Sequence, residues 1–311
     1  MSHLRIPSKI LLLFIFFPFF LSCEEEPEPG PSLYDSILAL PNTSRFIEAI
    51  EQVEFDDDLK IDQSLTIFVP TDNAFDRFLS QNNFASIADI PREDLIAIIR
   101  YHVLPGGIDL PSLGNAYYLT ASGAGPNNSL VAILVENPGT RARLNKNVSV
   151  INQDLQAGSG FYNTIDEVLT LPTVLSILRQ NDAFEQMANG VFRVDGLADS
   201  LQNEELYTFL VAPNSVVETA LEDRYDVTDI LDLEETTLDS LMKYHVLVGN
   251  QTSEILGNSS DFEYETLLSD LDVRIEAVTT ISINSNIGLV LSDIQTINGV
   301  VHIIDGMLDI D

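Results

Sequence analysis

Three histidines, His102, His245 and His302, could supply acid–base chemistry near neutral pH, because imidazole is the side chain whose ordinary pKa lies there. The fourth, His3, lies in an N-terminal signal described below. His102 and His245 each end an i, i+3, i+4, i+7 series of apolar residues, which is one face of a helix. This pattern predicts two core histidines, bonded to backbone or to a carboxylate, that lock helix ends. The alternative is a catalytic base or ligand, which would require converging partners that the sequence does not place.

The remaining candidates for chemistry are weaker. Acidic pairs such as Glu204-Glu205 could in principle act as the two carboxylates of a glycosidase, but a chain with 48 acidic residues contains such pairs by chance. No P-loop, nucleophile elbow, HExxH or dinucleotide-binding pattern occurs. His302 lies in a strand-like run whose counterpart earlier in the chain has Asn163, which favours a surface or strand-pairing position. We therefore expect no enzyme activity, no metal site and no cofactor; an unrecognised hydrolase using His102 or His245 is the competing hypothesis.

The composition excludes further classes. The chain has 311 residues, 48 acidic and 15 basic, with a net charge of −33. Duplex nucleic-acid binding requires clustered lysines and arginines, so we expect no nucleic-acid partner. A single cysteine excludes an intramolecular disulfide and a Cys-cluster metal site. The 45% hydrophobic content argues against a disordered acidic chain, so the acids belong to the surface of folded domains.

The predicted helices that carry His102 and His245 belong to a sequence unit that occurs twice in the chain. Three blocks recur in the same order roughly 140 residues apart, a domain's length and far longer than a solenoid repeat. The matching blocks are Thr66–Asn73 with Thr208–Ser215, Ile98–Leu104 with Leu241–Leu247, and Gly160–Asp166 with Gly299–Asp305. This predicts a tandem duplication with a boundary near Leu171-Pro172.

Each unit reads as α+β, with helices early and strands late. The start of the first unit has helical apolar spacing, and a short apolar strand, Leu65–Val69, follows it. The polar residues after that strand can cap the next helix, and Pro91 begins another. Later segments such as Val273–Ala277 and Ile281–Ile283 alternate as strands do. Tyr101 and Tyr244 precede the two histidines and therefore lie towards the flank of the apolar stripe.

The N-terminus is a targeting segment. An uncharged apolar run, Ile10–Leu21, is too short to span a bilayer as a helix, which needs about 20 residues. Phe20–Cys23 resembles a bacterial lipobox, which implies removal of residues 1–22 and lipidation of Cys23; an ordinary secretory signal is the alternative. Residues 23–30 form an acidic, Pro-rich tether similar to the surface-export signal of Bacteroidetes lipoproteins. The predicted location is the outer membrane, with the domains facing outward.

The repeated blocks resemble the fasciclin domain family. Thr66–Phe75 is similar to its first signature box, Tyr101-His102 and Tyr244-His245 to its central Tyr-His motif, and Asn298–Asp305 to its second box. The resemblance implies two tandem domains, residues 31–171 and 172–311, each a β-sheet wedge with helices packed at one side. It also implies adhesion without catalysis. In animal relatives the Tyr-His region is linked to receptor binding, so Tyr101, His102, Tyr244 and His245 are the binding candidates.

Two departures from the family pattern stand out. Ala212–Ser215 replaces the Pro-Thr-Asp of the first box, so we expect that turn to differ in the second unit. Gly158–Asn163 replaces the stretch that carries the second-box histidine, which puts any role of that histidine in doubt in the first unit.

The predicted function is a non-enzymatic cell-surface lipoprotein that mediates adhesion or binds a matrix or cell-surface macromolecule. The alternative is a glycan- or nutrient-capture lipoprotein that works beside an outer-membrane transporter. The expected partners are the membrane, through the lipid on Cys23, and an extracellular protein or glycan.

Overall fold

The computed structural model describes residues 30–310, apart from 62–63, 138–140, 259–260 and 278–279. The predicted signal and Cys23 lie outside the described residues. Within the described part of the chain, no helix combines the length and the apolar character needed to cross a membrane. The chain from Pro31 onward forms one compact unit that contains two seven-stranded sheets, one in each repeat. We call residues 31–171 the first repeat and residues 172–311 the second repeat.

The first repeat begins with helices and ends with strands. Its helices are α1 (Leu33–Leu38), α2 (Ser44–Gln52), α3 (Asp56–Lys60), α4 (Asp72–Gln81) and α5 (Arg92–Tyr101), with 3-10 turns η1 (Ile87–Asp89), η2 (Leu110–Ser112) and η3 (Pro126–Asn128). Its strands are β1 (Leu65–Pro70), β2 (Val103–Pro105), β3 (Ala116–Leu119), β4 (Ala132–Glu136), β5 (Arg143–Leu144), β6 (Val148–Ala157) and β7 (Gly160–Ile165). The strand order is β2-β1-β7-β6-β5-β4-β3, and only β1 and β7 pair in parallel.

The second repeat has the same plan. Its helices are α6 (Val174–Gln180), α7 (Glu185–Arg193), α8 (Leu197–Ser200), α9 (Asn214–Tyr225), α10 (Glu235–Tyr244) and α11 (Ser253–Gly257), with 3-10 turns η4 (Asp182–Phe184) and η5 (Ile230–Asp232). Its strands are β8 (Tyr207–Val211), β9 (Val246–Val248), β10 (Phe262–Tyr264), β11 (Val273–Ala277), β12 (Ile281–Ile283), β13 (Ile287–Thr296) and β14 (Gly299–Ile304). The strand order, β10-β11-β12-β13-β14-β8-β9, again has one parallel pair, β8 with β14.

Main-chain hydrogen bonds link the two ends of each sheet. In the first repeat the Ala121 amide, just after β3, donates to the Val103 carbonyl of β2. In the second repeat the Val248 amide of β9 donates to the Glu265 carbonyl, just after β10. Both ends of each sheet therefore have backbone partners, which satisfies groups that an open edge would leave exposed.

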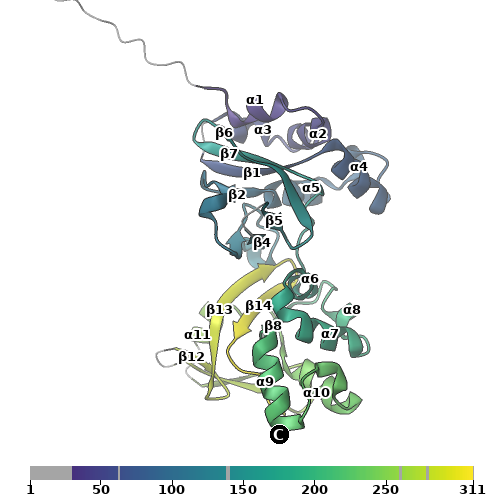
Figure 1. Cartoon of the computed structure of the whole chain (residues 1–311), viewed down its shortest axis with the longest axis vertical. Coiled ribbons are helices and arrows are strands. Elements are labelled where there is room, and N and C mark those ends of the chain that lie inside the picture. The colour runs from purple at the N-terminus through teal and green to yellow at the C-terminus, as the bar shows by residue number, and fades with distance from the viewer. Residues whose placement is uncertain (1–29, 62–63, 138–140, 259–260, 278–279, 311) are drawn as a thin grey trace, which may run out of the picture. The chain divides into compact units, whose positions relative to one another are not determined.

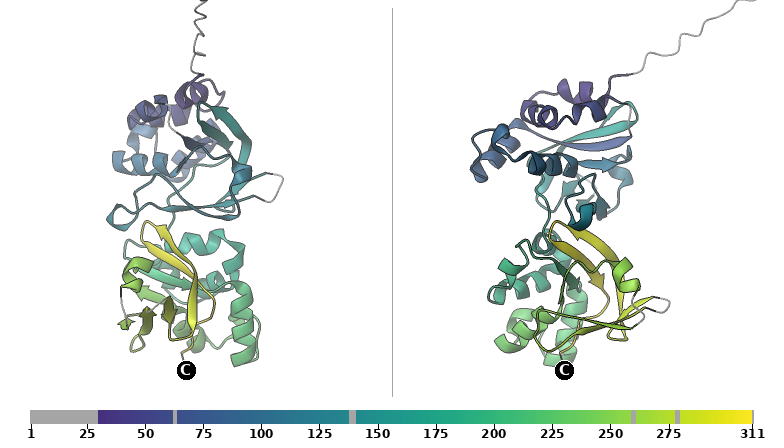
Figure 2. Two further views of the ribbon diagram at one scale, coloured as in Figure 1. Left: turned by 90° about the vertical axis from the view of Figure 1, so that its left-hand side faces the viewer. Right: turned by 180° about the vertical axis from the view of Figure 1, so that it is seen from behind.

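Most helices of each repeat pack on one side of its sheet, as the α+β prediction requires, whereas the short helix α11 lies against β11 and β12. Figure 1 shows α7, α9 and α10 gathered beside the second sheet while β12 and β13 lie away from them, and Figure 2 shows the same segregation from two other directions. In the first repeat, residues of α2, α4 and α5 form one buried cluster with the sheet, and the far side of the sheet forms another. In each repeat, helices from the first part of the sequence therefore form a layer that packs against the sheet.

The turn after the first strand differs between the repeats, as expected. In the first repeat the Thr71 hydroxyl caps α4 by accepting a hydrogen bond from the Ala74 amide at 3.3 Å. In the second repeat Pro213 precedes α9 and makes no side-chain cap. Asn214 instead accepts a hydrogen bond from the Gln186 amide at 3.0 Å and so ties α9 to α7. The altered box exchanges a local cap for a contact between helices.

Candidate functional site

His102 and His245 are the residues that cap the C-terminal ends of α5 and α10. Both imidazoles are completely buried. Nδ1 of His102 lies 2.8 Å from the Ile98 carbonyl, and Nδ1 of His245 lies 2.8 Å from the Leu241 carbonyl. A carbonyl oxygen can only accept, so each Nδ1 carries the proton.

The second ring nitrogen ties each helix to a distant segment. The Leu169 amide donates to Nε2 of His102 at 3.0 Å, and the Leu308 amide donates to Nε2 of His245 at 3.1 Å. Leu169 and Leu308 lie just after the last strand of each repeat. Each histidine thus joins the end of a helix to the end of its sheet, and the prediction of core histidines that lock helix ends is confirmed.

The same environment keeps the imidazoles neutral. Burial lowers the pKa of His102 to about 4, although the hydrogen bond to the Ile98 carbonyl acts in the opposite direction. Burial likewise lowers the pKa of His245 to about 4, opposed by the Leu241 carbonyl and assisted by nearby Arg224. A neutral ring with both nitrogens bonded to backbone has no free position for a reacting proton or a metal ion.

Tyr101 is buried as deeply as His102, although it lies towards the flank of the apolar stripe. The α5 stripe faces the cluster of the helix layer, while Tyr101 belongs to the cluster on the far side of the sheet. Two cores therefore contact α5 from different sides. The Tyr101 hydroxyl donates to the Ala132 carbonyl at 3.0 Å, and burial raises the pKa of this hydroxyl.

A turn asparagine completes the environment of each tyrosine. Asn145 Nδ2 donates to the Tyr101 hydroxyl at 3.0 Å, and Asn284 Nδ2 donates to the Tyr244 hydroxyl at 2.9 Å. Both asparagines have positive φ, 48° and 46°, a conformation that asparagine tolerates better than most residues. The Tyr-His motif therefore also holds a strand-connecting turn. Local patterns in the sequence do not predict this role, although an Asn-x-Asn triplet recurs at the repeat spacing just before β6 and β13.

His302 occupies a strand position in β14, as predicted, but it is buried and not at the surface. Its Nδ1 accepts a hydrogen bond from the Asp293 amide at 3.1 Å, and its Nε2 donates to the Gln251 carbonyl at 2.8 Å. In the first repeat, Asn163 Oδ1 accepts from the Asp154 amide at 2.8 Å, but Asn163 Nδ2 is buried with no partner among the described residues. The asparagine thus reproduces one of the two histidine contacts.

None of the four Tyr-His candidates reaches the surface. Tyr101, His102 and His245 are fully buried, and Tyr244 is 3% exposed. Their contribution to binding stays a prediction, and direct contact with a macromolecule would require the repeat to open. Among the described residues, no three His, Cys, Asp or Glu side chains lie close enough together to hold a metal ion.

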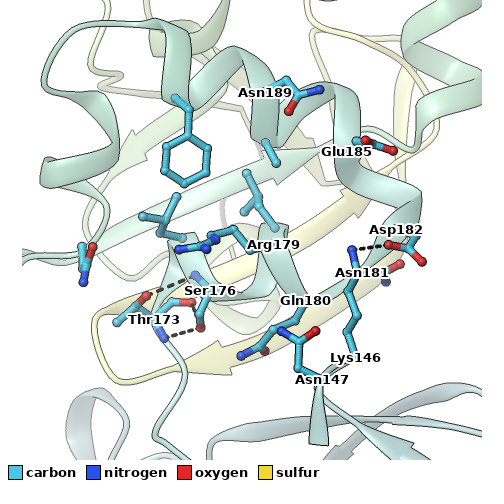
Figure 3. Close-up of a pocket in the computed structure, with 15 residues that line it drawn as sticks. Lys146, Asn147, Thr173, Ser176, Arg179, Gln180, Asn181, Asp182, Glu185 and Asn189 are labelled. Atoms are coloured by element: carbon cyan, nitrogen blue, oxygen red, sulfur yellow. Dashed lines mark hydrogen bonds and ion pairs between the residues drawn. The ribbon is translucent and has the colours of Figure 1, made fainter. Parts of the chain in front are cut away.

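A surface hollow on the second repeat has a volume of about 520 Å³. We call it the Arg179 groove. It is lined mainly by α6, η4 and α7, and Figure 3 shows Arg179 near its centre with Glu185 and Asn189 of α7 around it. Lys146, from the turn before β6, reaches its rim and forms an ion pair with Asp182.

Comparison with known proteins agrees with this architecture. The Fasciclin domain family matches residues 41–172 and 182–310. The chain belongs to the fasciclin family. Its two repeats are therefore tandem fasciclin domains, and fasciclin domains are typically adhesion or binding modules.

Two similar proteins illustrate the relationship. The chain is 23% identical over 129 residues to Protein sll1483 of Synechocystis sp., an alignment that covers 42% of this chain and 67% of that protein. It is also similar to the solved structure of a FAS1 domain pair from the insect cell adhesion molecule fasciclin I, with a TM-score of 0.54 and 20% identity. That comparison covers 86% of this chain and 97% of the insect pair, so the fold is that of a fasciclin domain pair.

The segment around the predicted boundary at residues 171–172 belongs by its hydrogen bonds to the second fasciclin domain. The Ile297 amide donates to the Pro172 carbonyl, and the Val174 amide donates to Asn298 Oδ1 at 2.9 Å. The family match resumes only at residue 182, after α6. The hydrogen bonds place α6 with the second sheet.

Proposed function

We propose that this protein is a surface-exposed lipoprotein that binds a macromolecule of the matrix or of a neighbouring cell, without catalysis. The proposal rests on one observation: the folded part of the chain consists of two fasciclin domains. Such domains typically serve adhesion or binding, and an array of two can increase avidity when both engage.

The state of the histidines supports a non-enzymatic role. His102 and His245 are neutral and buried, and backbone groups occupy both nitrogens of each ring. A general base requires a nitrogen within hydrogen-bond reach of substrate. If an unrecognised hydrolase activity used either ring, His102→Gln or His245→Gln would abolish turnover at unchanged stability. We expect instead a loss of stability, because a buried backbone group then loses its partner.

The N-terminal segment supports anchoring at the membrane. A lipid on Cys23 would attach the chain, and the acidic, Pro-rich residues 24–30 would hold the domains away from the bilayer. One acyl chain alone gives only reversible membrane binding, so stable attachment requires the multiply acylated cysteine of bacterial lipoproteins.

Two strains test the proposal. In the first the gene is deleted, and in the second it encodes Cys23→Ser. We expect both strains to attach more weakly to matrix or neighbouring cells than the parent strain, and the Cys23→Ser protein to leave the membrane fraction. A complemented deletion strain is the control. Attachment by the deletion strain at the parental level would show that the proposal is wrong.

A second candidate function, nutrient capture beside an outer-membrane transporter, is favoured by the polar Arg179 groove, whose lining suits a small hydrophilic ligand better than a flat protein surface. Detergent extraction followed by affinity isolation of the protein tests it. Co-isolation of a transporter at a fixed ratio, with normal attachment by the deletion strain, would favour capture over adhesion.

A further inference from the structure

Arg179 is held in place by an aromatic ring. Its guanidinium carbon lies 5.5 Å from the centroid of the Phe192 ring, which is 51% exposed. An arginine stacked on an aromatic ring gains cation–π stabilisation and keeps its N–H edge free to donate. The stack joins α6 to α7 across the Arg179 groove, so the donors of Arg179 are positioned before any ligand arrives.

Arg179 is one of the few basic residues in the described part of the chain for which no acidic partner is found, and it is the one that lines the groove. Most lysines and arginines in the described part of the chain form an ion pair with one of the many carboxylates, whereas no described carboxylate pairs with Arg179. A guanidinium has five N–H donors in a planar fork that matches a carboxylate with two parallel hydrogen bonds. The groove therefore presents a guanidinium that is positioned to bind a carboxylate.

The groove also offers uncommitted amides. Gln180, Asn189 and Gln202 line it, and none makes a side-chain hydrogen bond to another described residue. Gln180 Oε1 is in addition buried, so this oxygen has lost water without gaining a protein partner. A side-chain amide both donates and accepts, and this is the capacity that the hydroxyl groups of a sugar require.

Some polar residues of the groove are already engaged within the protein. The Ser176 hydroxyl is bonded within the cap of α6, and Asn181 accepts a hydrogen bond from the Ala183 amide. The groups available to a ligand are therefore Arg179, the free amides, to which Asn147 at the rim adds a fourth, and the exposed Phe192 ring, whose face can pack against the C–H groups of a sugar.

We infer that the Arg179 groove is a saccharide site that takes a sugar bearing a carboxylate, with Arg179 binding the carboxylate and the amides binding the hydroxyl groups. The inference rests on the proposed binding function and gives it a site and a ligand class. An acidic peptide would supply the carboxylate but few hydroxyl groups, so it would leave the free amides without partners. The chain's net negative charge opposes any anion at long range, but physiological salt screens that repulsion beyond about 8 Å.

Calorimetric titration of the purified protein with three matched probes tests the inference. Trigalacturonate carries sugar and carboxylates, galactotriose is its counterpart without charge, and triglutamate carries carboxylates without sugar. We expect saturable binding of trigalacturonate, at least tenfold weaker binding of galactotriose, and no binding of triglutamate. The tenfold preference corresponds to the loss of a charge-assisted pair of hydrogen bonds.

Four variants locate the site. Arg179→Gln should weaken trigalacturonate binding at least tenfold, and Phe192→Leu should weaken it severalfold, because the stack that positions Arg179 is lost. Glu185→Gln should strengthen it, because an acid in the groove repels the ligand. Arg193→Gln removes the same charge from the next residue after Phe192, outside the groove, and should change affinity less than twofold. Thermal melting of each variant reports whether it is folded.

Each outcome decides the inference. Equal binding of the two saccharides would overturn the carboxylate role, and preferential triglutamate binding would make the groove a peptide site. No saturable binding of any probe at millimolar concentration, or equal losses in Arg179→Gln and Arg193→Gln, would overturn the site. A strain with Arg179→Gln that attaches normally would remove the groove from adhesion, while the proposed adhesion function would fail only if the deletion strain also attached normally.

Discussion

The two buried histidines should make both fasciclin domains less stable as the pH falls from 6.5 towards 4. In an unfolded chain an imidazole has a pKa of about 6.5. Burial lowers the pKa of His102 and of His245 to about 4 in the folded protein. Below pH 6.5 the unfolded chain therefore binds protons that the folded chain does not, so the stability present at neutral pH is progressively lost and the loss levels off below pH 4.

The size of this effect follows from the two pKa values. At pH 5 the unfolded imidazole is almost fully protonated and the folded one is mostly neutral, which corresponds to about 2 kcal/mol per histidine. Hydrogen bonds from Lys60 and Arg274 lower the pKa of the Asp56 and Asp261 carboxyls, and these also favour folding at higher pH. Their contribution is lost only below about pH 4, so measurements between pH 7.5 and 5 isolate the histidines.

The assay compares urea unfolding, followed by far-UV circular dichroism, at pH 7.5 and pH 5. The wild-type protein should lose about 2 kcal/mol in the first domain over this range, and more in the second domain, where burial lowers the pKa of both His245 and His302. His102→Gln should remove the pH dependence of the first domain only. His245→Gln should reduce that of the second domain only, because buried His302, whose pKa burial also lowers, remains there. Each variant is the control for the other. NMR titration of the imidazole C–H groups measures the same pKa values directly. Folded-state midpoints near 6.5, or variants with the wild-type pH dependence, would refute the reasoning.

Three further substitutions test the remaining contacts by the same urea assay. His302→Asn should cost about 1–2 kcal/mol, because it leaves a buried donor unpaired as Asn163 does in the first domain. Tyr101→Phe should cost about 1–3 kcal/mol, because Asn145 Nδ2 then loses its acceptor. Gly299→Ala should cost at least about 3 kcal/mol: its φ is +144°, and a Cβ would lie only 1.8 Å from a backbone oxygen of β8.

Matched substitutions separate these effects from general disturbance. Tyr118→Phe removes an exposed hydroxyl bonded to Gly114 and should change stability by less than about 0.5 kcal/mol. Gly257→Ala lies in α11, where a Cβ would meet no atom closer than 3.8 Å, and should be neutral or stabilising. If Gly299→Ala behaved like Gly257→Ala, the close approach of β14 to β8 would be wrong.

Several features followed from the sequence because they depend on local patterns. The apolar stripe that ends at His102 predicted a buried imidazole at a helix end, and the structure has one. The repeated blocks predicted two α+β domains of one family. The apolar spacing predicted that helices precede most of the strands within each domain. The altered box at Ala212–Ser215 predicted a changed turn. Each of these inferences needs only side chains that are neighbours on one helix, strand or turn.

Other expectations needed the third dimension. Tyr101 lies at the edge of its helical stripe, yet it is buried because α5 contacts a core on each of two sides. His302 was expected either at the surface or in a strand-pairing position. It lies in β14, where the packing of the sheet buries it. The periodicity of apolar residues shows one buried face of a helix or strand, but it does not show whether a second face is also buried against another part of the protein.

The sequence by itself determined the duplication, the fold class and the location of His102 and His245 in the core, because periodicity and repeated blocks are properties of the chain. Only the tertiary structure decided what those residues hold. The amide bonded to His102 is 67 residues away and the one bonded to His245 is 63 residues away. The stacking of Arg179 on Phe192 likewise joins two helices. Such contacts follow from how helices and strands pack against each other, which no local pattern encodes.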